Sequence, residues 1–173
     1  MKNVRSEVIK YAKKLNTKKL SALRSGNISV RYKEGFLITP SGVKYSSLKN
    51  KDIVFVSLGG KFNKEKGIPS SEWRFHQDIY IKKIDAKAIV HAHSNYATAL
   101  STHGKGIPAF HYMVAMAGGN DIKCAKYATY GTRELSMSIL KALKNRSACL
   151  IGNHGQIAFS ENLSKAFELA EEV

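Results

Sequence analysis

The sequence predicts a mixed α/β domain in which helices cover a sheet that is at least partly antiparallel. Apolar residues recur at helical spacing in several segments, and between them lie short runs rich in β-branched residues that end at glycine turns. Two of these runs, 28–32 and 36–39, are separated by a turn short enough for a hairpin, which joins antiparallel neighbours. With 173 residues the chain has the length of one domain, so we expect residues 1–173 to form a single domain.

The first third of the chain is expected to contain one helix and three strands. The helix covers roughly residues 3–20, where apolar side chains recur every three or four positions. An alternating strand follows over 28–32, and its hairpin partner is 36–39. The next apolar run, 53–58, ends at Gly59-Gly60 and is expected to be a strand as well.

A second helix is expected to begin at the segment Pro69-Ser70-Ser71-Glu72, which offers hydroxyl caps and an acidic first turn. Its apolar face is expected to carry these residues: Trp73, Phe75, Ile79 and Ile84. The apolar segment 88–93 then forms a strand, and a short helix runs from Ser94 towards His103.

The last third of the chain is expected to hold two helices and two strands. Thr132 caps a helix that reaches Leu143. The apolar runs 148–151 and 156–159 are strands on either side of a tight glycine turn. Ser160 is expected to cap a final helix that runs to Val173.

Composition excludes several classes of protein. Hydrophobic residues make up 43% and charged residues 24%, as in an ordinary globular protein. There is no run of 18 apolar residues, so no membrane span is expected. The first residues lead into an amphipathic pattern rather than an apolar signal core, so we expect a cytoplasmic protein. Cys124 and Cys149 lack any motif spacing, which fits a reducing compartment.

The net charge of +15 leaves three interpretations open. A basic domain can bind nucleic acid, but the lysines are scattered, and no RNA-binding aromatic signature or zinc-finger spacing accompanies them. A solvated lysine-rich surface fits this scatter better. A positive field can also attract small anionic substrates. Charge alone does not choose between these interpretations.

Chemistry is suggested first by His91 and His93, at the end of an apolar strand. Side chains two residues apart on a strand share a face, so both imidazoles are expected to point to one place. Two imidazoles that converge in this way can bind one metal ion. The alternative is a pair of surface histidines with ordinary hydrogen bonds.

His154 and Glu72 are the further candidates for this centre. His154 lies in a glycine-flanked turn after a buried-type strand, where a polar ring needs either a backbone partner or a metal. Three imidazoles would leave a coordination position open, as in catalytic zinc sites. Glu72 is a candidate for a ligand or a proton carrier. Alternatively, it only complements the dipole of its helix.

Three turns rich in glycine and serine could bind a phosphate group through backbone N–H groups and hydroxyls. They are Gly26-Asn27, Ser41-Gly42 and Ser70-Ser71. No Walker pattern occurs. The order Glu72-x-x-x-His76 is not the zinc-protease pattern, so His76 is interpreted as structural.

Seven segments, taken together and in order, resemble the class II aldolase/adducin family over nearly the whole chain. The segments are Ser25-Gly26-Asn27-Ile28-Ser29, Thr39-Pro40-Ser41-Gly42, Pro69-Ser70-Ser71-Glu72-Trp73-Arg74-Phe75-His76, Val90-His91-Ala92-His93, Ile107-Pro108-Ala109-Phe110-His111-Tyr112, Gly131-Thr132-Arg133-Glu134-Leu135 and Asn153-His154-Gly155. The resemblance implies a three-layer α/β/α fold with a mainly antiparallel central sheet, assembled as a homotetramer with sites between subunits.

The resemblance also implies an activity: zinc-dependent cleavage of a ketose 1-phosphate, of the L-fuculose 1-phosphate type, to dihydroxyacetone phosphate and a short aldehyde such as L-lactaldehyde. One Zn²⁺ per subunit would be held by His91, His93 and His154, and Glu72 would be the acid/base. Tyr112 of a neighbouring subunit would handle the proton on the aldehyde oxygen. The phosphate would be bound by Gly26, Asn27, Ser41, Gly42, Ser70 and Ser71. Neither nucleic acid nor membrane is expected as a partner.

Two departures from the family pattern bear on substrate choice. The family's aldolases usually continue beyond the position of Val173, so we expect a segment that could close over the site to be absent. Tyr130 stands where such aldolases often carry phenylalanine, which is expected to alter the aldehyde pocket.

Other functions within the family stay open as alternatives. Methylthioribulose-phosphate dehydratases keep a glutamate and are the stronger rival, whereas pentulose-phosphate 4-epimerases place aspartate where Glu72 stands. Adducin-like interaction domains have lost catalytic residues that this chain retains. A nucleic-acid-binding module is the outside alternative.

Overall fold

Seven strands form a single sheet in the computed structural model, which describes residues 4–173. The strands are β1 (Asn27–Tyr32), β2 (Gly35–Ile38), β3 (Val54–Ser57), β4 (Ala88–Ala92), β5 (Cys124–Ala125), β6 (Ala148–Ile151) and β7 (Gly155–Ser160). Their order in the sheet is β3-β2-β1-β4-β7-β6-β5. Every neighbouring pair is antiparallel except β5 and β6. The prediction of a mainly antiparallel sheet is therefore confirmed.

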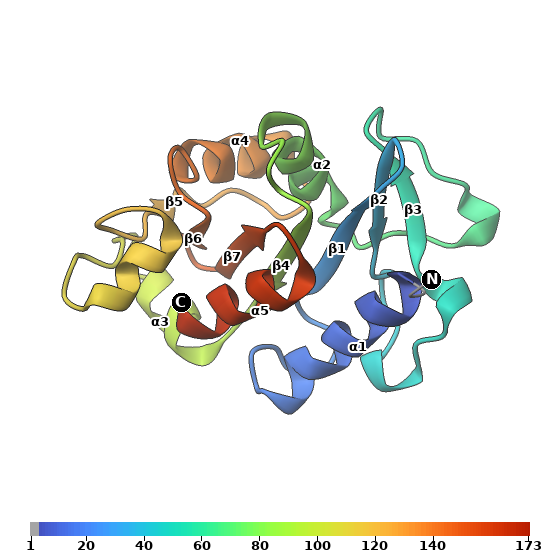
Figure 1. The fold of residues 1–173 in the computed structure, drawn as a ribbon, viewed down its shortest axis with the longest axis horizontal. Coiled ribbons are helices and arrows are strands. Elements are labelled where there is room, and N and C mark those ends of the chain that lie inside the picture. Colours follow the sequence, from blue (N-terminus) through green and yellow to red (C-terminus); the bar gives the residue numbers. More distant parts are fainter. Residues whose placement is uncertain (1–3) are drawn as a thin grey trace.

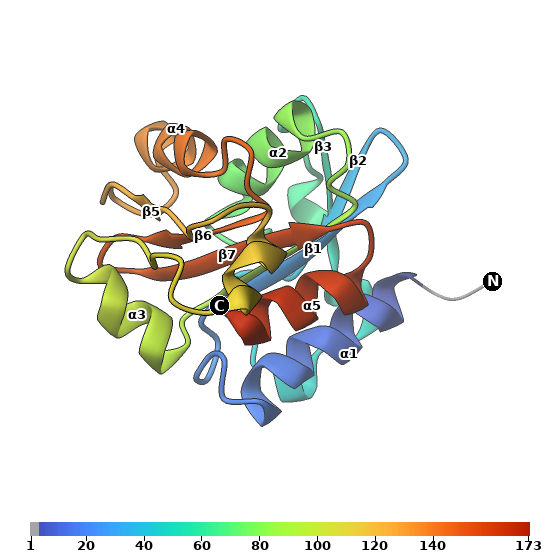
Figure 2. The same cartoon turned by 60° about the vertical axis from the view of Figure 1, so that its left-hand side comes forward.

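Five α-helices cover the two faces of the sheet in the described part of the chain (Figure 1). They are α1 (Val4–Thr17), α2 (Trp73–Lys82), α3 (Asn95–Ser101), α4 (Arg133–Ala142) and α5 (Leu163–Glu172). Helices α2 and α4 lie on one face, and α1 and α5 lie on the other, as Figure 2 shows most clearly. The predicted α/β/α layers are thus present. Asn3, where the first helix was expected to begin, lies outside the described residues.

Two apolar cores, one on each face, hold these layers together. Alternation along β4 shows how the sequence divides its side chains between them: Val90 belongs to the core under α1 and α5, whereas Ile89 belongs to the core under α2 and α4. His91 is two residues after Ile89, so its side chain lies on the same face of the sheet. It is fully buried, with its ring centroid 5.3 Å from that of Phe75 on α2. The strand therefore delivers His91 to the face that carries α2.

Four short 3₁₀ helices occur in the described connections: η1 (Tyr45–Ser47), η2 (Asn50–Asp52), η3 (Lys64–Lys66) and η4 (Tyr112–Ala117). From the sequence, no element is predicted between His103 and Thr132, where the structure has η4. Strand β5 was not predicted, because two residues are too few for a periodic signal.

Two details of the predicted helices are wrong. Ile84 does not contribute to the apolar face of α2, because the helix ends at Lys82 and Ile84 is 84% exposed. The cap of α5 is Asn162, whose Oδ1 accepts a hydrogen bond from the backbone N–H of Lys165 at 2.9 Å. Ser160 instead ends β7, where it pairs with Ala88.

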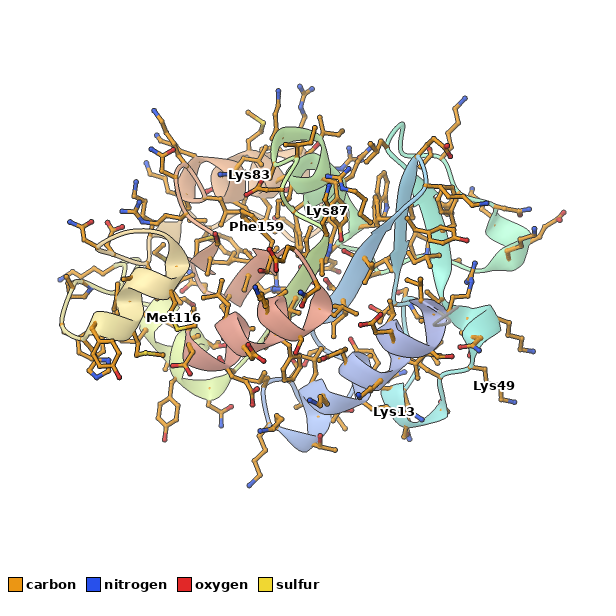
Figure 3. The ribbon with its side chains drawn as sticks, in the orientation of Figure 1. Lys13, Lys49, Lys83, Lys87, Met116 and Phe159 are labelled. Atoms are coloured by element: carbon orange, nitrogen blue, oxygen red, sulfur yellow. The ribbon has the colours of Figure 1, made fainter. Side chains whose placement is uncertain are left out.

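Basic side chains come from many separate elements. Lys13, Lys49 and Lys87, labelled in Figure 3, are all exposed and belong to α1, the start of η2 and the turn before β4.

Within residues 4–173, no helix has both the length and the apolar character needed to cross a membrane.

Candidate metal centre and active site

Three separate regions of the chain bring four potential metal ligands together. Glu72 stands at the start of α2, His91 and His93 lie at the end of β4, and His154 lies in the turn between β6 and β7. One ligand atom from each side chain lies within 4.8 Å of the ligand atoms of the other three. The convergence of His91, His93 and Glu72 with His154, expected from the sequence, is therefore present in the structure.

The orientation of His91 is fixed by a backbone contact. Its Nδ1 donates a hydrogen bond to the carbonyl oxygen of Gln156 on the neighbouring strand at 2.7 Å. In the neutral ring this places the proton on Nδ1 and leaves a lone pair on Nε2. Nε2 points into the cluster, 2.9 Å from Nε2 of His93. Such a hydrogen bond on the remote nitrogen is the usual support of a histidine metal ligand.

His93 and His154 are held by their backbones. The N–H of His93 donates to Oγ of the buried Ser21 at 3.0 Å, which fixes the chain just after β4. The N–H of His154 donates to the carbonyl oxygen of Ile151 at 3.0 Å, within a turn where Asn153 has a φ of 54°. The ring centroid of His154 then lies 4.9 Å from that of His91 and 4.8 Å from that of His93.

Glu72 completes the cluster from the opposite side. Its side chain is almost fully buried, with Oε2 at 3.2 Å from Nε2 of His91 and Oε1 at 3.1 Å from Nε2 of His154. Oε1 has no hydrogen-bond partner among the described residues. A buried carboxylate oxygen without a hydrogen bond costs stability unless a cation or a proton satisfies it.

This donor set fits a divalent metal ion. Three imidazoles and one carboxylate are ligands that zinc and related cations accept, and tetrahedral zinc places its donor atoms about 3.4 Å apart. The spacings of 2.9 Å, 3.1 Å and 3.2 Å in the cluster are close to that value.

The electrostatics of the cluster favour ligand-competent protonation states. Burial on its own would raise the pKa of Glu72, but attraction to His91 and the contacts with His154 outweigh it and lower that pKa well below its ordinary value. Burial, assisted by His91 and His154, lowers the pKa of His93 to about 3. Both groups are therefore in the deprotonated form that binds metal at neutral pH.

A pocket of about 370 Å³ opens beside the cluster and contains all the turns predicted to bind phosphate. Its lining includes Gly26, Asn27, Ser41, Gly42, Ser70 and Ser71 together with Glu72, His93 and His154. The φ values of 74° at Gly26 and 73° at Gly42 favour glycine at both positions. A Cβ at Gly26 would also lie 2.6 Å from the carbonyl oxygen of His91, so this turn packs directly against β4.

Two predicted site residues have distinctive positions. The side chain of Asn27 is buried, and its Nδ2 donates to Oε2 of Glu72 at 3.0 Å, so its amide is already engaged beside the metal cluster. Tyr112 does not line the pocket of its own chain. It is 79% exposed at the start of η4, where its ring packs against His111 at 4.4 Å.

Sequence reasoning missed Arg24 and Tyr127, which also line the pocket. The guanidinium of Arg24 donates to the carbonyl oxygen of Gly42 at 2.9 Å and so bridges two of the candidate phosphate turns. A basic residue two positions before Gly26 was a signal that could have found it. Tyr130, which was singled out for the aldehyde pocket, lies on the rim and is 65% exposed.

Comparison with known proteins agrees with this geometry. Residues 6–173 match the sequence model of the "Class II Aldolase and Adducin N-terminal domain". The chain is 54% identical to "L-fuculose phosphate aldolase" of Escherichia coli K12 over 149 residues, which cover 86% of this chain and 69% of that protein. It is 48% identical to "5-methylthioribulose-1-phosphate/5-deoxyribulose-1-phosphate aldolase" of Rhodospirillum rubrum over 170 residues, which cover 98% of this chain and 76% of that protein.

A solved structure shows the same fold. The structure titled "L-fuculose 1-phosphate aldolase" superposes with a TM-score of 0.95 at 42% sequence identity, and the match covers 99% of this chain and 82% of that one. The seven-stranded sheet and its two helical layers are therefore the class II aldolase fold.

Proposed function

Because the chain belongs to the class II aldolase and adducin family, we propose that it is a metal-dependent aldolase that cleaves a ketose 1-phosphate reversibly to dihydroxyacetone phosphate and a short aldehyde. One observation carries this proposal: three imidazoles and the buried carboxylate of Glu72 converge beside a pocket lined with turns rich in glycine and serine. The proposed domain is the whole chain, residues 1–173.

The proposed metal is Zn²⁺, held by His91, His93 and His154, with Glu72 beside it. When bound there, the ion supplies a Lewis-acid charge that stabilises negative charge developing on the substrate's carbonyl and neighbouring hydroxyl oxygens. The support is the donor chemistry of the cluster and the Nδ1 hydrogen bond that turns Nε2 of His91 inward.

The phosphate end of the substrate is proposed to lie in the turns around Gly26, Ser41-Gly42 and Ser70-Ser71. These turns share one pocket with the metal cluster, and the N-terminus of α2 stands behind Ser71. Backbone N–H groups at a helix start favour a dianion. Arg24 would add a charge-assisted donor from the rim. Anchoring the phosphate in this way orients one particular C–H of the substrate towards Glu72.

Glu72 is proposed as the acid/base. Its Oε1 lacks a hydrogen-bond partner among the described residues and lies 3.1 Å from Nε2 of His154, so it is free to accept a proton from carbon and to return it. Its low pKa means that it starts the cleavage cycle deprotonated, as a base must. In the resting state the same oxygen would complete the metal's ligand set.

The substrate is proposed to be of the L-fuculose 1-phosphate type, by similarity to the E. coli relative. A second candidate is 5-methylthioribulose 1-phosphate or 5-deoxyribulose 1-phosphate, by similarity to the R. rubrum relative, which aligns over nearly all of this chain. These substrates share the ketone and the phosphate and differ at the aldehyde end. Tyr127, Ala128 and Tyr130 line the side of the pocket that we assign to that end.

We further propose a homotetramer in which Tyr112 serves the site of a neighbouring subunit. Two large hydrophobic side chains before and at the start of η4 support an interface there, because they are exposed in the single chain: Phe110 at 76% and Tyr112 at 79%. The ring of His111 lies 6.2 Å from that of Phe110 and 4.4 Å from that of Tyr112. Large exposed apolar side chains that lie together favour protein contacts.

The test of the proposed function is a coupled assay. Zinc-loaded protein is incubated with L-fuculose 1-phosphate, 5-methylthioribulose 1-phosphate and 5-deoxyribulose 1-phosphate, and dihydroxyacetone phosphate is detected with a dehydrogenase and NADH. We expect product from at least one of these ketose 1-phosphates, its loss after treatment with a chelator, and its return with zinc. Absence of dihydroxyacetone phosphate with all three substrates, together with loss of water from one of them, would identify a dehydratase instead.

A further inference from the structure

A continuous line of five polar side chains runs through the interior between α2 and β1. Its members are Glu72, Asn27, His76, Ser29 and Tyr80. The most exposed of the five is Glu72 at 7%, and both Ser29 and His76 are at 0%. Buried polar groups are costly unless every member has a partner, so a line of this length between two apolar layers calls for an explanation. We call it the polar seam.

The spacing of the residues explains the seam. Glu72, His76 and Tyr80 are four residues apart, so they share one side of α2. Asn27 and Ser29 are two residues apart on β1, so they share one face of the strand. The helix and strand residues interleave, with contacts of 3.0 Å, 2.5 Å, 2.7 Å and 2.8 Å from Glu72 along the line to Tyr80.

Every hydrogen bond in the seam has a fixed direction. The carboxylate of Glu72 only accepts, so Asn27 must present Nδ2 to it and therefore presents Oδ1 to His76. Oδ1 also only accepts, which puts the ring proton of His76 on Nε2 and leaves Nδ1 to accept from the hydroxyl of Ser29. Ser29 then accepts from the hydroxyl of Tyr80. All protons point towards Glu72.

Burial stabilises this single arrangement. It lowers the pKa of His76 to about 3, with help from His91, so the ring stays neutral and keeps one donor and one acceptor. Burial likewise raises the pKa of Tyr80 above its ordinary value, so its hydroxyl keeps the proton that it donates. Neither His76 nor Tyr80 therefore changes its role as donor or acceptor in the seam at neutral pH.

We propose that the polar seam holds the carboxylate of Glu72 in the orientation needed for proton transfer, with His76 as the positioning residue that acts through Asn27. Asn27 binds Oε2, which also lies 3.2 Å from Nε2 of His91, so Oε1 is left as the carboxylate oxygen without a hydrogen bond, 3.1 Å from Nε2 of His154. This inference rests on the proposed role of Glu72. It assigns a function to His76, which does not itself line the pocket.

The main experiment compares two substitutions at one position. His76→Gln keeps a nitrogen donor for Asn27 and an acceptor for Ser29, whereas His76→Leu removes both. If the seam positions Glu72, His76→Leu lowers kcat by about tenfold or more, as expected for disturbing a hydrogen bond to a charged group, while KM and bound zinc stay unchanged. His76→Gln restores most of the lost kcat.

Ser29→Ala and Ser136→Ala form the matched pair that separates positioning from packing. Both serines are fully buried, but Ser136 donates to Asp78 at 2.5 Å, outside the seam. We expect Ser29→Ala to lower kcat about threefold, since it removes a bond one step further from Glu72, and Ser136→Ala to leave kcat unchanged at a similar loss of thermal stability. Equal kcat values for both variants, or an unchanged kcat in His76→Leu, would overturn the proposal.

A second readout does not depend on activity, so it separates failure of the seam from failure of the proposed function. In metal-free protein at pH 7.5, ¹⁵N shifts of the His76 ring should show the Nε2–H tautomer. The ¹³C shift of the Glu72 carboxylate should change in His76→Leu and stay the same in Ser136→Ala. An Nδ1–H tautomer of His76 would overturn the proposed role of the seam even in an active aldolase. So would a ¹³C shift of Glu72 that is the same in His76→Leu as in the wild type.

Discussion

At the scale of single residues, the site depends on which atom of each side chain is left free. Nδ1 of His91 donates a hydrogen bond to a backbone carbonyl oxygen, which leaves Nε2 directed into the cluster. Glu72 uses Oε2 on Asn27 and presents Oε1. Asn27 uses Nδ2 on Glu72 and Oδ1 on His76, so both ends of its amide are engaged. Each free atom can therefore be tested by a substitution that removes it and keeps the shape.

Glu72→Gln keeps the shape of the side chain but removes the proton-accepting carboxylate. We expect turnover to fall by about 10²-fold or more, the usual loss for a missing general base. Bound zinc should be unchanged, because the three histidines remain. Kinetics and elemental analysis measure the two quantities on the same sample, with the exposed Glu65→Gln as control. Full activity in Glu72→Gln would show that another group transfers the proton.

His154→Ala removes one of the three imidazoles. We expect bound zinc to fall well below the wild-type content, because two histidines and a carboxylate leave the ion more exposed to exchange. The matched control is His103→Ala, since His103 is exposed and lies outside the cluster. Elemental analysis after dialysis measures both variants. The same zinc content in His154→Ala and His103→Ala would remove His154 from the ligand set.

Arg24→Ala tests the residue that bridges two of the proposed phosphate turns. Loss of a charge-assisted hydrogen bond to the phosphate is expected to raise KM for the ketose 1-phosphate about tenfold with little change in kcat. Lys13→Ala, which removes an exposed charge from α1, serves as control for the general positive field. If both variants raise KM equally, Arg24 acts through the long-range positive field and not through a contact with the phosphate.

At the scale of elements, a helix start could be predicted from the sequence where only one residue was a good cap. Thr132 caps α4 as predicted, with its Oγ1 accepting from the N–H of Leu135 at 3.2 Å. The start of α5 was ambiguous, because Ser160 and Asn162 are both good caps. Ser160 pairs with Ala88 and so belongs to β7. Because of this tertiary contact, Asn162 is the cap of α5.

Asn162→Ala tests this correction. The substitution removes the acceptor for the N–H of Lys165, so the free energy of unfolding should fall by about 1 kcal/mol, the usual effect of losing a helix cap. Ser160→Ala should leave it nearly unchanged, since the hydrogen bond that Ser160 accepts from Lys87 uses its backbone oxygen. Urea denaturation measures both variants. A larger loss in Ser160→Ala would restore Ser160 as the cap.

At the scale of the whole molecule, the sheet converts distant segments into one site. Pairing of His91 with Ile157 places β4 beside the hairpin that carries His154, and pairing of Asn27 with His91 places the turn at Gly26-Asn27 beside both. The sequence could identify the histidines as candidate ligands, because histidines at strand ends are conspicuous. It could not show that Asn27 turns its amide to Glu72, since that depends on how α2 packs on β1.

Buried neutral histidines make the stability of the metal-free protein depend on pH. The pKa of His76 and that of His93 are both lowered to about 3, whereas an unfolded histidine titrates near 6.5. Between these values the unfolded chain binds more protons, so the free energy of unfolding should decrease as pH falls from about 6.5 towards about 3. Above about 6.5 this contribution is complete.

Urea denaturation in the presence of a chelator at several pH values measures this slope. His76→Gln has one titrating histidine fewer, so its stability should fall less steeply with acid than that of the wild type. An identical slope in both proteins would show that His76 is protonated in the folded state.

The convergence of His91, His93 and His154 on one cation is the central claim, and anomalous diffraction at the zinc edge tests it most directly. Crystals grown with one equivalent of zinc should give a single strong peak per chain, within bonding distance of Nε2 of all three histidines and next to Oε1 of Glu72. A crystal that contains zinc but shows its peak away from these four side chains would contradict the account.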